Sequence, residues 1–76
     1  MDRDKAIKAA NEELNTLLVY IANSQLIITE TMYESWDAEE IMRCKEALEY
    51  TSQAREKAIA GTELYIDKLN KENNRV

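Results

Sequence analysis

The sequence predicts an all-α protein, an antiparallel two-helix hairpin that assembles into a homo-oligomeric bundle. Three observations predict it. The 76 residues include no proline and one glycine, so few residues interrupt a helix. Apolar and polar residues never alternate strictly over the length of a strand. The stretch Leu17–Ile28 is apolar almost all the way round a helix, as buried helices are, yet so short a chain cannot surround it alone.

The first helix is expected from about residue 3 to residue 34. Asp2 or Asp4 can accept hydrogen bonds from its free N–H groups, and acidic residues suit the positive end of the helix dipole. Apolar residues spaced three and four apart then predict a heptad seam, which another helix covers. Its members are Ile7, Ala10, Leu14, Leu17, Ile21, Ser24, Ile28 and Thr31, widened by Leu18, Met32 and Trp36.

The remaining segments are a turn at 35–37, a second helix from about 38 to 70 and a frayed tail at 71–76. Asp37 and Glu40 have the spacing of a capping box, in which Glu40 reaches back to the Asp37 N–H. Because the turn is short, the helices are expected to pack antiparallel as one domain covering 1–76. The seam of the second helix contains Ile41, Cys44, Leu48, Thr51, Arg55, Ala58, Thr62, Tyr65 and Leu69.

Charge and composition narrow the classes of function. A net charge of −5 disfavours nucleic acid and anionic membranes as partners. The apolar window is too short to cross a bilayer, and the first residues lack the pattern of a signal peptide. One cysteine cannot form an internal disulfide, and without histidine a closed zinc site is excluded. We expect a cytoplasmic protein with a reduced thiol and no metal or cofactor.

The sequence contains no recognisable catalytic set. It has no histidine to activate Cys44, no glycine-rich phosphate loop and no spaced metal ligands. Cys44 falls on the seam, where a thiol is buried and inert. We therefore expect a protein that is not an enzyme.

Arg55 is the one charged residue within the seam of the second helix. An unpaired buried guanidinium is strongly unfavourable, so Arg55 either pairs with an acid such as Glu13 or extends to water from the edge of the seam. Alternatively, it binds an anionic ligand together with the hydroxyl groups of Thr51 and Thr62. The sequence leaves both interpretations open.

A strip of small residues at seven-residue spacing lies beside this seam. Its members are Ala47, Ala54 and Gly61. Such a strip either packs closely against another helix or forms the floor of a groove. In the second case Tyr50 can stack on a base, while Arg43 and Lys57 can bind phosphate.

Aromatic residues and acids provide two further candidate surfaces. Trp36 either covers the end of the core or, with Tyr33, stacks a base beside a helix N-terminus whose free N–H groups bind phosphate. The acids on the outer side of the second helix form either a solvated surface or a binding surface for a basic partner. They are Glu39, Glu40, Glu46, Glu49, Glu56, Glu63 and Asp67.

Two stretches resemble known families. Residues 45–54 look like the long C-terminal helix of phage anti-CBASS cyclic-nucleotide sponges, with Glu-Ala, an aromatic three residues later and another alanine four residues after that. This resemblance implies a small helical protein whose hexamers hold signalling nucleotides between subunits. Residues 37–48 resemble the turn and second helix of the Rop family, plasmid RNA-binding hairpins that dimerise. The first helix departs from that family's RNA-reading face, because Lys5 and Lys8 are followed mostly by acids and apolar residues.

Three functions are consistent with these observations. We favour a non-catalytic viral or mobile-element protein that sequesters a small nucleotide immune signal between subunits, in the cytoplasm of the host cell. Its partner in assembly is another copy of itself, bound through Leu17–Ile28. The residues expected to bind the ligand are Arg43, Tyr50, Thr51, Arg55 and Lys57, with Tyr33 and Trp36 at the turn. The alternatives are an acidic interaction module or inhibitor of a host protein, and a Rop-like RNA-binding dimer that uses Lys5 and Lys8.

Overall fold

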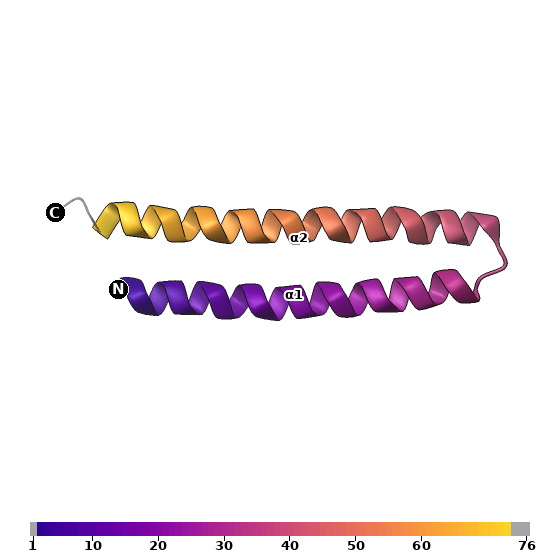
Figure 1. Ribbon diagram of the computed structural model, residues 1–76, viewed down its shortest axis with the longest axis horizontal. Helices are drawn as coiled ribbons and strands as arrows, with labels where there is room; N and C mark the ends of the chain where they lie inside the picture. Colours follow the sequence, from indigo (N-terminus) through magenta and orange to yellow (C-terminus); the bar gives the residue numbers. More distant parts are fainter. Residues whose placement is uncertain (1, 74–76) are drawn as a thin grey trace.

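The computed structural model describes residues 2–73 and shows two long helices packed antiparallel (Figure 1). Helix α1 spans Arg3–Glu34 and helix α2 spans Ala38–Asn73. Within this described part the chain has no strand, so the all-α prediction is confirmed. Helix α2 continues past its predicted end at residue 70, and the last part of the predicted tail, 74–76, lies outside the described residues.

The hairpin is thin and elongated. Its extents are 62 × 16 × 11 Å, and its radius of gyration is 17.5 Å. A compact globular protein of this length would have a radius of gyration of about 11 Å. Two helices in a single layer leave both broad sides of the hairpin open to solvent, which limits how much of each helix a single chain can bury.

Short side chains define the start of each helix. The Asp2 carboxylate accepts a hydrogen bond from the Asp4 N–H at 3.0 Å, and Asp37 accepts one from the Glu39 N–H at 3.0 Å. The predicted capping box is wrong. The Asp37 N–H donates instead to the Ser35 hydroxyl at 3.2 Å, because the tight turn brings that side chain back to it.

The predicted heptad seam of α1 matches the structure only in part. Leu17, Ser24 and Thr31 are exposed, and the half-buried positions there are the next residues along, Leu18, Gln25 and Met32. A straight α-helix has 3.6 residues per turn, so a strict heptad drifts by about 20° every seven residues. This drift moves Leu17, Ser24 and Thr31 out of contact with α2, whereas Ile21 and Ile28 stay half-buried. Leu18 and Met32, which widened the predicted seam, are half-buried as predicted.

In α2 the predicted seam is wrong at two positions. Ile66 is half-buried in place of Tyr65, which is 43% exposed, in agreement with the same drift. Arg55 is exposed, and the half-buried residue beside it is Ala54. The small alanine lets the helices approach, while an unpaired guanidinium between them would lose its hydration without compensation.

Very little of the chain is buried. Among the described residues, only Ala6 and Cys44 are classed as buried, at 7% and 9% exposure, so the prediction of a buried thiol is confirmed. Large apolar side chains remain exposed on both helices: Leu17, Val19, Tyr20, Leu26, Ile27, Tyr33, Trp36, Met42, Tyr50, Leu64 and Tyr65. A single hairpin therefore leaves much of its apolar surface in water, which is unusual for a protein that functions alone.

Neither helix, within the described residues, is long and apolar enough to span a membrane.

Candidate binding groove

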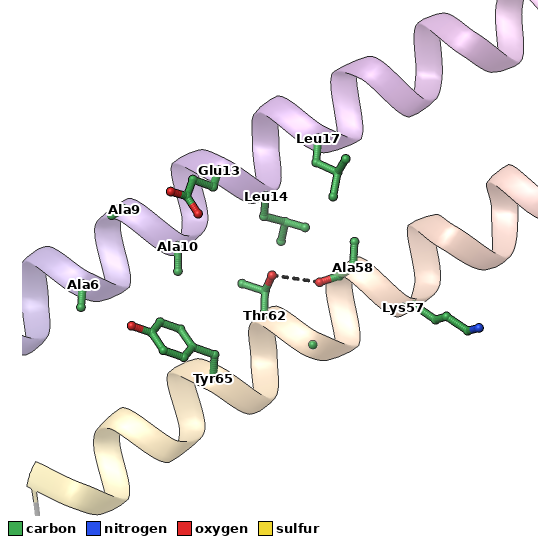
Figure 2. A pocket seen from close by; sticks show the side chains of 11 residues that line it. Ala6, Ala9, Ala10, Glu13, Leu14, Leu17, Lys57, Ala58, Thr62 and Tyr65 are labelled. Carbon is green, nitrogen blue, oxygen red and sulfur yellow. Dashed lines mark hydrogen bonds between the residues drawn. The ribbon is translucent and has the colours of Figure 1, made fainter.

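A groove of about 490 Å³ runs between the two helices near the chain termini (Figure 2). We call it the terminal groove. Its lining from α1 is Ala6, Ala9, Ala10, Glu13, Leu14 and Leu17, and its lining from α2 is Lys57, Ala58, Gly61, Thr62 and Tyr65. Figure 2 shows the Tyr65 ring turned toward α1 and the Lys57 side chain directed away from it. The groove is thus mainly apolar, with one acid and one base in its lining.

Small side chains, not a gap in the backbone, create the terminal groove. Gly61 adds to it although nothing in the single chain requires glycine there, because a Cβ at this position would meet no atom within 4 Å. Thr62 offers no free hydroxyl donor to a ligand in the groove, because its hydroxyl donates to the Ala58 carbonyl oxygen at 2.9 Å. The groove can therefore accept an apolar or aromatic group more readily than a strongly polar one.

A smaller hollow of about 100 Å³ lies next along α2, and we call it the Tyr50 hollow. It is lined by Tyr50, Gln53, Ala54 and Lys57. Tyr50 is 76% exposed, so one side chain offers an open aromatic face close to a cation. The structure thus brings together two of the predicted ligand-binding residues, Tyr50 and Lys57, with the alanine of the predicted groove floor. Lys57 lines both the Tyr50 hollow and the terminal groove.

Arg43 lies nearer the turn and already has a partner. Its guanidinium donates to the Glu39 carboxylate at 2.9 Å, the i,i+4 arrangement, with both side chains largely in solvent. An exposed pair of this kind is weak and can be replaced by a ligand phosphate. Arg43 is not part of the lining of either hollow.

Thr51 serves a structural contact in this chain. Its hydroxyl donates to the Leu48 carbonyl oxygen at 2.8 Å and accepts from the Gln25 side-chain amide at 3.1 Å. Sequence reasoning missed Gln25, because a strict heptad seam places Ser24 rather than Gln25 toward the partner helix. A helix of 3.6 residues per turn would have identified it.

Arg55 does not sit between the helices as the seam predicted. Its side chain is exposed, and it forms no ion pair with any acid in the part of the chain that the structure describes. Pairing with Glu13 is therefore not seen, and the exposed guanidinium agrees with an arginine that extends from the edge of the contact into water.

The turn places its aromatic side chains in solvent. Trp36 is 101% exposed and Tyr33 is 80% exposed, so the expectation that Trp36 covers the end of the core is wrong. The three-residue turn directs Trp36 away from both helices. The Asp37 carboxylate already accepts the hydrogen bond of the Glu39 N–H. Asp37, Glu39 and Glu40 also add negative charge at this end of α2, which opposes the binding of a phosphate there.

No cluster of three or more potential metal ligands occurs among residues 2–73. Comparisons with models of protein families, with curated proteins and with solved structures find no match to this chain. The resemblances to cyclic-nucleotide sponges and to Rop therefore stay predictions.

Proposed function

We propose that this chain is a non-catalytic subunit of a homo-oligomer that holds a small nucleotide between its subunits. The observation that carries the proposal is the Tyr50 hollow, where an exposed aromatic ring lies beside Lys57 and the small Ala54. Nucleotides are gripped without chemistry by stacking of the base on an aromatic ring and by cations on the phosphate. The resemblance of residues 45–54 to the sponge family covers this same part of α2.

The ligand needs more than one hairpin to be enclosed. One chain offers shallow, open surfaces, whereas small-molecule sites usually bury most of their ligand's surface. A second subunit over the same side of the hairpin would supply the missing wall. The exchangeable cation Arg43 lies seven residues before Tyr50 and so shares its direction on α2. The exposed cation Arg55 lies about 140° round the helix and would reach the ligand from a neighbouring subunit.

The test begins with native mass spectrometry of the protein purified from cells, which gives the subunit number and the mass of any retained ligand together. Isothermal titration calorimetry then measures binding of defined probes: AMP, GMP, and cyclic di- and trinucleotides of adenosine and guanosine. We expect at least one cyclic probe to bind and to be recovered chemically unchanged. Recovery of a hydrolysed product would contradict a non-catalytic role.

Single substitutions test which residues bind the ligand. Tyr50→Ala is expected to weaken binding of that probe at least tenfold, because it removes the stacking surface. Arg55→Ala is expected to weaken it while leaving the oligomer intact. Lys45→Ala is the matched control, since Lys45 is an exposed cation on α2 outside both hollows. Unchanged binding in both site variants would refute this site, and dissociation of Arg55→Ala would make that residue structural.

A second candidate function is supported by the outer side of α2. All seven acids predicted there are exposed in the structure. Such a surface suits an interaction module or inhibitor that binds a basic partner protein. This function predicts no nucleotide binding and association with a basic protein that weakens as salt is raised from 50 to 500 mM, so the calorimetry above separates the two.

A further inference from the structure

Helix α1 carries two exposed apolar strips that face different directions. The Tyr20 strip consists of Tyr20 and Ile27, which are 67% and 63% exposed. The Val19 strip consists of Val19 and Leu26, each 58% exposed. Members of each strip are seven residues apart and so share a direction, whereas the two strips are offset by one residue, about 100° round the helix.

A polar residue separates the two strips. Asn23 follows Val19 by four residues and Tyr20 by three, so it projects between them, and it is exposed. The Tyr20 strip continues at seven-residue spacing the row of Ala6 and Glu13, which line the terminal groove. The Val19 strip does not belong to that row. One helix laid over both strips would have to bury Asn23, which costs stability, whereas two helices, one on each strip, leave Asn23 in solvent.

The exposed area of the chain is larger than expected for a compact monomer of its mass. The accessible surface is 6295 Å². A folded monomer of 8.8 kDa would expose about 4,800 Å² on the usual scaling of area with mass. The excess of about 1,500 Å² corresponds to about two standard interfaces of roughly 800 Å² per partner, or to one obligate interface. The separation of the two strips on α1 favours two interfaces.

Charge favours another copy of this chain as the occupant of both strips. The four residues of the strips are uncharged, exposed Glu12 and Glu30 lie between the strips on the Asn23 side of α1, and seven exposed acids lie on α2. Copies that meet through the strips of α1 keep those acids in solvent, where their mutual repulsion is screened. A highly basic partner would be drawn to the acids of α2 instead.

We infer that each hairpin contacts two neighbouring copies, one through the Tyr20 strip and one through the Val19 strip, so that the assembly exceeds a dimer. The copy on the Tyr20 strip lies on the side of the terminal groove and encloses it, whereas the copy on the Val19 strip leaves it open. This inference rests on the self-association in the proposed function, and it adds which surface builds the ligand site.

The experiment places the same charge on each strip and between them. Ile27→Glu, Leu26→Glu, the double variant and the control Asn23→Glu are compared with the wild-type chain by sedimentation equilibrium at 10–200 μM and by native mass spectrometry. Circular dichroism checks that each variant stays helical, as expected for exposed positions. If a glutamate variant loses helix, Ile27→Gln and Leu26→Gln replace it, because they remove the apolar contact without adding charge.

We expect the wild type and Asn23→Glu to exceed a dimer, each single strip variant to stop at a dimer, and the double variant to be monomeric. A wild-type dimer, unchanged assembly in either strip variant, or equal dissociation by Asn23→Glu would overturn the inference. The cyclic probe that binds the wild type is titrated in parallel: Ile27→Glu should lose its binding and Leu26→Glu should retain it. Absence of binding in every protein, with the assembly series as expected, would refute only the nucleotide proposal.

Discussion

Gln25 and Thr51 join the two helices through a side-chain hydrogen bond of 3.1 Å from the Gln25 amide to the Thr51 hydroxyl. The same amide reaches the Ser52 hydroxyl at 3.4 Å. These are the hydrogen bonds between α1 and α2 that the described residues make through side chains. Apolar contacts tolerate sliding of one helix along another, whereas a hydrogen bond between fixed positions does not. The pair therefore stabilises one register of the hairpin, which the three-residue turn between the helices already restricts.

Replacing Thr51 tests this role. Thr51→Val keeps the shape of the side chain but removes the acceptor, and we expect the free energy of unfolding to fall by about 1 kcal/mol. Ser52→Ala removes the longer, exposed contact and should change it by less than about 0.5 kcal/mol. Urea unfolding followed by circular dichroism, at one protein concentration, measures both. A larger loss in Ser52→Ala would show that Ser52 is the main acceptor.

Gly61 predicts opposite effects on folding and binding. In Gly61→Ala the new methyl group meets no atom of the hairpin within 4 Å, so the better helix former should stabilise the chain by about 0.5–1 kcal/mol. The same methyl group narrows the terminal groove and should weaken whatever docks there. Thermal unfolding and probe titration measure the two effects. Ala60→Gly, on an exposed neighbouring position, should only destabilise.

The buried thiol of Cys44 reports opening of the hairpin. A thiol at 9% exposure must wait for local separation of the helices before a reagent reaches it. We expect labelling by a thiol reagent to be at least about tenfold slower in native buffer than in 6 M urea. Thr51→Val, seven residues or about two helical turns further along the same seam, should speed native labelling. Equal rates in buffer and urea would show that the contact around Cys44 is not formed in solution.

Trp36 is expected to contribute little to the stability of the single hairpin. At 101% exposure it has lost no contact with water, so Trp36→Ala should shift the free energy of unfolding by less than about 0.5 kcal/mol. As the only tryptophan, it should also emit at the wavelength of a tryptophan in water. A blue-shifted emission in the wild-type protein would place the turn inside an interface or a ligand site.

The sequence was sufficient for the two helices and the turn between them. The scarcity of Gly and Pro and the Asp37 cap are local signals, and they determine where helices begin and end. The residues through which the two helices pack against each other were harder to predict. A heptad assumed along the whole of α1 chose Ser24 instead of Gln25 and gave Leu18 only a secondary place beside Leu17, because the hairpin follows 3.6 residues per turn rather than 3.5.

The candidate site was predictable only where its residues share one helix. Tyr50, Ala54 and Lys57 lie within two turns of α2, so their spacing alone placed them together. The α1 half of the terminal groove, with Ala6 and Leu17, depends on the register between helices and was not foreseen. Arg55 was misplaced for another reason: helical spacing gives the direction of the Cα–Cβ bond, not where a long charged side chain ends.

Because so few side chains are buried, the stability of this protein should depend on its concentration in the cell. With only Ala6 and Cys44 buried among the described residues, most of the apolar area that could stabilise the fold remains to be covered by neighbours. Stability gained from association rises with the concentration of the chain itself. Under the proposed assembly, a few copies would be partly open and vulnerable to proteases, whereas many copies would protect one another. The protein would then act above a threshold of expression, instead of in proportion to it.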